Sequence, residues 1–88
     1  MSYSIVYFNK VKRFIEKLDE KTKSRIKESI EKLAFDHVPH KAVRVEGQKE
    51  KVFRIRVGDF RVLYVIHQED KEITVFNVDK MSEFSTSF

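Results

Sequence analysis

The most regular pattern of hydrophobic and polar positions lies in residues 52–66, which read VFRIRVGDFRVLYVI. The first half alternates apolar residues with Arg54 and Arg56, the period-two pattern of a strand with one buried face. Gly58 and Asp59 then interrupt the run with residues that suit a tight turn. Most of the second half is β-branched or aromatic. The stretch therefore predicts a β-hairpin.

Three arginines share one face of this predicted hairpin. Because side chains alternate across a strand, a covered apolar face leaves Arg54, Arg56 and Arg61 on the other face. On the second strand, the core is expected to hold Val62, Tyr64 and Ile66, and the open face Arg61, Leu63 and Val65. A guanidinium stays charged and its fork matches phosphate, so the three arginines predict an anion site. The alternatives are a solvated sheet face, or ion pairs with Glu46 or Glu72.

The first half of the chain predicts one strand and two helices. Ser2–Phe8 is expected to form the strand, and Asn9 to cap the first helix. Asp19 is expected to cap the second helix. Apolar residues recur at helical spacing, namely Val11, Phe14, Ile15 and Leu18 in the first helix and Ile26, Ile30, Leu33 and Ala34 in the second. The tight Leu18–Asp19 junction predicts an antiparallel helical hairpin.

The remaining segments complete an α+β fold with the order β-α-α-β-β-β-β. Beyond the hairpin the segments are a loop at Asp36–Ala42, a short strand at Val43–Glu46, turns at Gly47–Lys51 and Gln68–Lys71, a last strand at Glu72–Val78 and a polar tail at Asp79–Phe88. Short connections favour antiparallel pairing of the last four strands. We expect two layers, with the helical hairpin packed on one face of a mostly antiparallel sheet.

Composition narrows the functional classes. A chain of 88 residues is expected to be one domain, spanning residues 1–88. It has no cysteine and no long apolar run, so disulfides, thiolate metal sites and a membrane span are not expected, and we expect a cytoplasmic protein. His37 and His40 have a metal-like spacing, but two histidines around a proline seldom bind zinc. A net charge of +4 permits binding to nucleic acid or to an acidic partner.

The order of elements and the residues VFRIRVGDFRVLYVI resemble the RelE/ParE superfamily of toxins from type II toxin–antitoxin pairs. The helical hairpin and the short strand VRVEG at Val43–Gly47 also match this superfamily. The resemblance runs from Ser2 to about Met81 and rests on the combination of these features. It implies a RelE-like fold over the whole chain and a RelB-like antitoxin as partner. We expect the antitoxin to supply apolar side chains to the helices or to the strip of Leu63 and Val65.

RelE toxins of this superfamily cleave mRNA in the ribosomal A site without a metal. The resemblance implies that the messenger's 2′-hydroxyl attacks the neighbouring phosphate, leaving a cyclic phosphate and a free 5′-hydroxyl. The family's basic pair on the third strand falls on Arg54 and Arg56, and its arginine after the turn falls on Arg61. These residues would orient the phosphate and stabilise the pentavalent phosphorane, so they are the expected catalytic residues. No cofactor is expected.

Other positions depart from the family pattern. An arginine hardly loses its proton, so Lys49, Lys51 and Lys80 are the nearest candidates for proton transfer or substrate binding. Active relatives carry a basic residue and then a tyrosine near the C-terminus. In these relatives the basic residue is an arginine. Here Met81 occupies its place, with Lys80 beside it. Phe84, or Phe88 as an alternative, could stack on a base but has no proton to donate.

Three functions stay open at this point. The compact length and short helical hairpin resemble RelE and favour a ribosome-dependent endoribonuclease acting on mRNA. The missing C-terminal arginine and tyrosine favour a ParE-like toxin, which holds DNA gyrase and catalyses nothing. A degenerate toxin that only binds its antitoxin is the third possibility.

Overall fold

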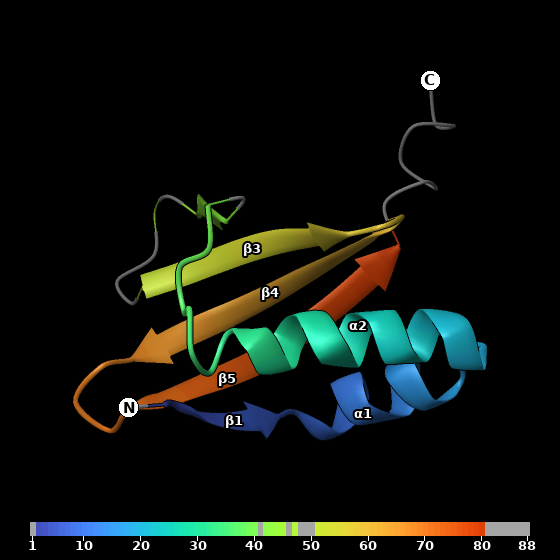
Figure 1. Cartoon of the computed structure of the whole chain (residues 1–88), viewed down its shortest axis with the longest axis horizontal. Coiled ribbons are helices and arrows are strands. Elements are labelled where there is room, and N and C mark those ends of the chain that lie inside the picture. Colours follow the sequence, from blue (N-terminus) through green and yellow to red (C-terminus); the bar gives the residue numbers. More distant parts are fainter. Residues whose placement is uncertain (1, 41, 46, 48–50, 81–88) are drawn as a thin grey trace.

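Two helices and five strands form two layers, as Figure 1 shows. The computed structural model describes residues 2–40, 42–45, 47 and 51–80. Along the chain the elements follow the order β1-α1-α2-β2-β3-β4-β5. The predicted order and the predicted α+β fold are therefore confirmed. No helix in the described ranges is long and apolar enough to cross a membrane.

The sheet has the strand order β1-β5-β4-β3-β2. Its strands are β1 (Ser4–Tyr7), β2 (Val43–Arg44), β3 (Lys51–Val57), β4 (Phe60–His67) and β5 (Glu72–Lys80). The pairs β2–β3, β3–β4 and β4–β5 are antiparallel, whereas β1 runs parallel to β5. The sheet is thus mostly antiparallel, as predicted, and the first and last strands are neighbours.

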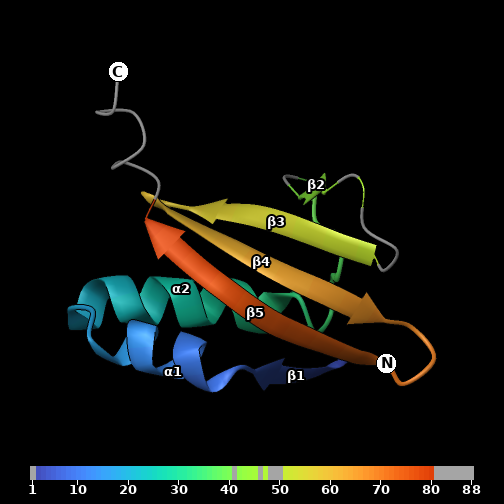
Figure 2. The same ribbon diagram turned by 180° about the vertical axis from the view of Figure 1, so that it is seen from behind.

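Helices α1 (Asn9–Glu16) and α2 (Glu20–Lys32) cover one face of this sheet (Figures 1 and 2). At α2 the predicted cap is confirmed, because an Asp19 carboxylate oxygen accepts a hydrogen bond of 3.1 Å from the Thr22 backbone N–H. Hydrogen bonds from Thr22 hold the pKa of Asp19 below its usual value. The predicted cap of α1 was wrong. Phe8 occupies the cap position without a side-chain hydrogen bond, and Asn9 is the first helical residue.

The hydrophobic core lies between the helices and the sheet, and its register agrees with the prediction. The exposed fractions of Ile30, Val62 and Tyr64 are 0%, and that of Ile55 is 2%. Arg54 and Arg56 alternate with the core residues of β3 and are exposed. Because side chains of one strand point alternately to its two faces, the arginines lie on the face that the helices leave open (Figure 2).

Several predicted boundaries need correction. The last strand continues to Lys80, so Asp79 and Lys80 belong to β5 and not to a polar tail. The first strand is shorter than predicted, and β2 comprises Val43 and Arg44, with Glu46 outside the described residues. The turns at Gly58–Asp59 and Gln68–Lys71 are confirmed, whereas the predicted turn at Gly47–Lys51 lies mostly outside the described residues and Lys51 is the first residue of β3. Gly58 lies at φ +60° and Lys71 at φ +50°, in the left-handed region where Gly58 avoids the strain of a Cβ atom.

A side-chain hydrogen bond ties the loop after α2 to the core. The buried Tyr64 hydroxyl donates to the backbone oxygen of His37 over 2.8 Å. The rings of Tyr3 and His37 pack with centroids 4.5 Å apart. Burial, with a smaller effect of Asp36, raises the pKa of Tyr64 far above the usual value for tyrosine. Tyr64 therefore keeps its proton and remains a donor throughout the physiological pH range.

Candidate functional site

The open face of the β3–β4 hairpin carries the three arginines that the sequence singled out. Arg56 and Arg61 are directly opposite each other on the two strands, and Arg54 is opposite Leu63. Directly opposite residues of antiparallel strands have Cβ atoms about 4.5–5.5 Å apart. We call Arg54, Arg56 and Arg61 the arginine face. Like charges this close repel each other, so a nearby anion would stabilise the arrangement.

Asp79 supplies part of this compensation. It is opposite Arg61 on β5, and its two carboxylate oxygens accept hydrogen bonds of 3.2 Å from Nε and 3.0 Å from Nη2 of Arg61. The exposed fractions of the two side chains are 29% and 32%. The two parallel contacts fix the plane of the guanidinium. Arg61 is therefore held in a fixed orientation and is only partly accessible.

A β-bulge puts Asp79 on this face. Tyr64 is opposite Val75, but the preceding Leu63 is opposite Asn77, so Phe76 is an extra residue in β5. The bulge shifts the buried position from Val75 to Val78 and turns Asp79 toward the arginines. The sequence analysis named Glu46 or Glu72 as ion-pair partners and missed Asp79. The sequence did contain a signal of the bulge. The buried apolar residues of β5 are Ile73 and Val75, at odd positions, and then Val78, at an even position, so the alternation shifts by one residue between them.

Arg56 and Arg54 are more exposed than Arg61. The Nε atom of Arg56 donates to the backbone oxygen of Gly58 over 3.4 Å, a long hydrogen bond. Within the described part of the chain, neither Arg54 nor Arg56 forms an ion pair. Their guanidinium groups are therefore available to an anion outside this chain.

Two of the predicted substrate-binding residues, Lys51 and Lys80, lie apart from the arginine face. Lys51 is opposite Ile66, at the end of β3 away from the Gly58 turn, and its Nζ lies 2.6 Å from the side-chain oxygen of Gln68. Lys80 is opposite Phe60, beside that turn, but alternation places it on the side of the sheet that faces the helices. Phe84 and Met81 lie outside the described residues.

Apolar residues on the open face are distributed differently from the expected strip. Leu63 and Val65 do lie on this face, yet the exposed fraction of Val65 is 9%, since Val52 is directly opposite. The more exposed residues are Val6, at 40%, Val43, at 48% and directly opposite Arg54, and Phe8, at 49%. The ring centroid of Phe8 is 6.4 Å from that of Phe76. The open face therefore offers hydrophobic surface near β1 and β5 besides the arginines.

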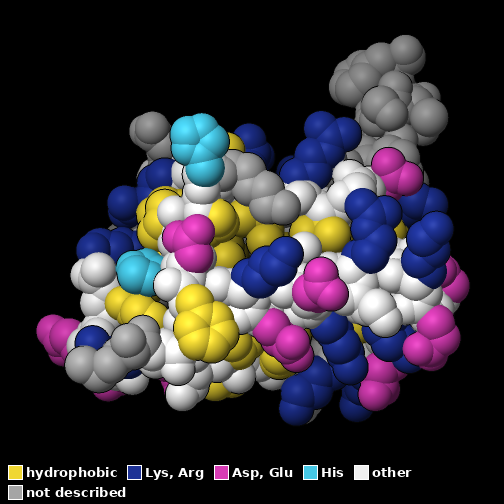
Figure 3. Space-filling model, in the orientation of Figure 1, with side chains coloured by type: hydrophobic (Ala, Val, Ile, Leu, Met, Phe, Trp, Pro, Cys, Tyr) yellow, Lys and Arg dark blue, Asp and Glu magenta, His cyan; other side chains and the backbone are white. Residues whose placement is uncertain are grey.

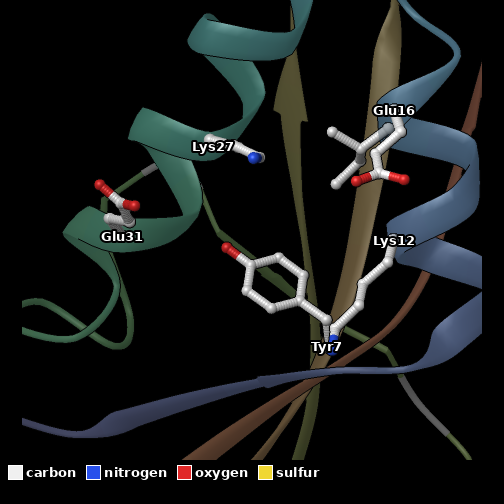
Figure 4. Close-up of a pocket in the computed structure, with 6 residues that line it drawn as sticks. Tyr7, Lys12, Glu16, Lys27 and Glu31 are labelled. Atoms are coloured by element: carbon white, nitrogen blue, oxygen red, sulfur yellow. The ribbon is translucent and has the colours of Figure 1, made fainter.

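A separate cavity of about 260 Å³ lies on the helix side, between β1, α1 and α2. Figure 4 shows the Tyr7 ring pointing toward Lys27 and Glu31 of α2, with Lys12 and Glu16 coming from α1. Burial, followed by the charge of Glu31, raises the pKa of Tyr7. Cations and carboxylates alternate around this cavity, so it carries no clear preference for an anion.

No group of three or more His, Cys, Asp or Glu side chains that could hold a metal ion occurs among the described residues.

Basic side chains gather on one part of the surface. In Figure 3 they lie, interspersed with acidic ones, over the first half of α2 and the adjacent end of the sheet. This is also the end of the hairpin at which Arg56 and Arg61 lie.

Comparisons with known proteins agree with this architecture. The chain is 26% identical over 82 residues to the candidate toxin RelE1 of Methanocaldococcus jannaschii, and the match covers 91% of each chain. It is similar to RelE in the RelE–RelB complex of Pyrococcus horikoshii, with a TM-score of 0.83, 25% identity and coverage of 92% of this chain and 97% of the other.

Two further solved structures share the fold at lower identity. The toxin–antitoxin complex RelBE2 of Mycobacterium tuberculosis matches with a TM-score of 0.78, 20% identity and coverage of 91% and 99% of the two chains. The isolated RelE toxin of E. coli matches with a TM-score of 0.79, 14% identity and coverage of 98% and 95%.

The family model for the ParE toxin of the type II toxin–antitoxin system parDE matches residues 5–83. This match begins at the second residue of β1 and spans both helices and all the other strands. The chain therefore belongs to the ParE toxin family, within the RelE/ParE superfamily of type II toxins.

Proposed function

We propose that this toxin acts in the cytoplasm by cleaving mRNA on the ribosome, with neither a metal nor a cofactor. The observation that supports this activity is the arginine face. Two exposed guanidinium groups and a third, held in place by Asp79, lie together on the surface that the helices leave open. Arginine forks bind phosphate oxygens in pairs, so such a surface suits the backbone of RNA.

The proposed reaction is a displacement within the RNA strand. The 2′-oxygen of one nucleotide loses its proton and attacks the adjacent phosphorus, and the bond from phosphorus to the 5′-oxygen breaks. The departing 5′-oxygen gains a proton, leaving a cyclic phosphate and a free 5′-hydroxyl. Negative charge builds up on the non-bridging oxygens in between. Fixed donors aimed at these oxygens stabilise the transition state, and each contributes roughly 3–4 kcal/mol.

The three arginines take different parts in this proposal. Arg61 is the best oriented, because Asp79 accepts hydrogen bonds from two of its donors and fixes the plane of its guanidinium. Arg54 and Arg56 neutralise charge and position the strand. None of them acts as the general base, since a guanidinium keeps its proton. Lys80 is the described lysine at the same end of the sheet, and we assign it, with Lys51 and Phe84, to substrate binding.

We also propose a RelB-like antitoxin as the partner. The neighbours from P. horikoshii and M. tuberculosis were solved as complexes with an antitoxin, which supports this partner. An acidic, amphipathic segment would neutralise Arg54 and Arg56 and cover the exposed Val6 and Phe8. Co-expression with the small neighbouring gene should give a complex that co-purifies and suppresses toxicity. A chain that is harmless and monomeric without any companion would argue against this.

The nuclease proposal is tested by primer extension on mRNA bound to purified ribosomes. The only metal ion in the buffer is the Mg²⁺ that the ribosomes need. Addition of the toxin should produce cuts in the A-site codon. The same mRNA without ribosomes is the control and should stay intact. Growth arrest without any cut in ribosome-bound mRNA would remove the proposal.

A second candidate function is a ParE-like poison of DNA gyrase. The observation that favours it is the family model itself, which describes ParE toxins and matches residues 5–83. In this case the toxin would stabilise gyrase-cleaved DNA and leave mRNA intact. A supercoiling assay with purified gyrase distinguishes the two functions. A chain that is inert in both assays but binds its antitoxin is the degenerate toxin.

A further inference from the structure

A cavity of about 230 Å³ lies between the first half of α2 and the β3–β4 turn. Thr22, Arg25 and Asp59 contribute its charged and hydroxyl groups, and Ile26 and Phe60 contribute apolar surface. Figure 1 shows that α2 begins at the end of the sheet where β3 turns into β4. The cavity thus joins the two layers beside the arginine face.

Arg25 reaches across this cavity to Gly58. A Cβ atom added at Gly58 would lie 3.8 Å from both Nη atoms of Arg25. From the other side of the turn, Arg56 donates to the backbone oxygen of Gly58. Two guanidinium groups, one from each layer, therefore flank a single residue. This juxtaposition cannot be seen in the sequence, where Arg25 is one of many charges on a helix.

Arg25 has no salt-bridge partner in the described part of the chain. No ion pair there includes Arg25, and Asp59 is the one acidic residue among the described residues that line the cavity. The carboxylate of Asp59 lies outside ion-pair distance of the guanidinium. A phosphate group would meet the fork of Arg25 and the hydroxyl donor of Thr22 in one hollow.

We propose that this cavity is a second phosphate subsite, in which Arg25 and Thr22 bind a backbone phosphate of the RNA strand whose neighbouring phosphate lies on the arginine face. The inference rests on the proposed function, because it extends the same RNA-binding surface around the Gly58 turn. Arg25 binds and positions the strand here and takes no part in the bond-breaking step. The subsite would fix the register in which the strand crosses the turn.

The test is binding of a fluorescent 2′-O-methyl RNA oligonucleotide to the full chain, followed by anisotropy at several salt concentrations. This probe lacks the attacking hydroxyl, so binding is measured without cleavage. Arg25→Gln should weaken binding roughly tenfold at low salt and reduce the salt slope by about 1. Arg25→Lys keeps the charge but loses the forked guanidinium, so its affinity for the RNA should lie between those of the wild type and of Arg25→Gln.

Lys32→Gln is the matched control. Lys32 lies about two turns further along α2, its side chain is 75% exposed, and its removal deletes the same charge. It should leave affinity and salt slope nearly unchanged. NMR of the wild-type chain adds a local readout, in which the Arg25 Nε–H and Gly58 amide resonances should shift when the RNA is added.

Equal losses for Arg25→Gln and Lys32→Gln would overturn the subsite, as would a wild-type chain that does not bind the oligonucleotide at low salt. Failure of the nuclease proposal gives a different result. In that case ribosome-bound mRNA stays intact, while the Arg25-dependent binding and its salt slope persist.

Discussion

The two faces of the same sheet differ sharply, although their residues alternate along the same strands. Toward the helices, Ile55, Val62 and Tyr64 are at most 2% exposed and form the core. Toward the open side, Arg54 and Arg56 are exposed on the same β3 strand and its neighbour carries Arg61. The difference teaches that one face is built from buried apolar side chains that stabilise the fold, whereas the other keeps charged side chains at the surface, where they contribute less to stability.

The largest expected effect on stability comes from a core residue. Ile30 is fully buried under the sheet, so Ile30→Ala should lower the free energy of unfolding by roughly 2–5 kcal/mol. Leu63→Ala, on the half-buried open face, should cost about 1 kcal/mol because less apolar area is lost from contact. Urea unfolding followed by circular dichroism measures both. Equal losses would show that the open face also supports the fold.

A smaller effect is expected at the hydrogen bond that ties the loop after α2 to the core. Tyr64→Phe removes the donor to the His37 backbone oxygen and should cost roughly 1–2 kcal/mol of unfolding free energy. Tyr3→Phe is the matched control, since the Tyr3 contact to His37 is through its ring. A Tyr64→Phe protein as stable as Tyr3→Phe would mean that the loop is held by other contacts.

The smallest effect is a pH dependence at the exposed N-terminus of α2. The folded-state pKa of Asp19 is lowered from 3.8, so its stabilising contribution is fully present above pH 3.8 and is lost as pH falls through the folded-state value. Thermal melting of the wild type and of Asp19→Ala should therefore differ at pH 7 and converge in more acidic buffer. A difference between the two melting temperatures that does not depend on pH would contradict this role for the carboxylate.

The sequence predicted the fold well because period-two and helical patterns depend on local alternation. Ile55 and Arg54 were placed on the correct faces by that rule alone. The cap of α1 was missed, since Phe8 takes the cap position without any side-chain hydrogen bond to signal it.

The candidate site was harder to predict because it depends on contacts between distant segments. Asp79 reaches Arg61 only through the bulge at Phe76 and the pairing of β5 with β4. Arg25 approaches Gly58 only because α2 packs beside the turn. Neither contact follows from spacing along the chain, whereas the grouping of Arg54, Arg56 and Arg61 follows from the hairpin itself.

The claim that the open face carries the activity is tested most directly by cleavage of ribosome-bound mRNA by Arg61→Ala. Loss of one preorganised donor should lower the cleavage rate about a hundred- to a thousandfold, while the circular dichroism spectrum and antitoxin binding stay unchanged. Lys32→Gln, which removes a cation on the helix side, should cut at nearly the wild-type rate. An Arg61→Ala protein that cuts as fast as the wild type would show that the active site lies elsewhere.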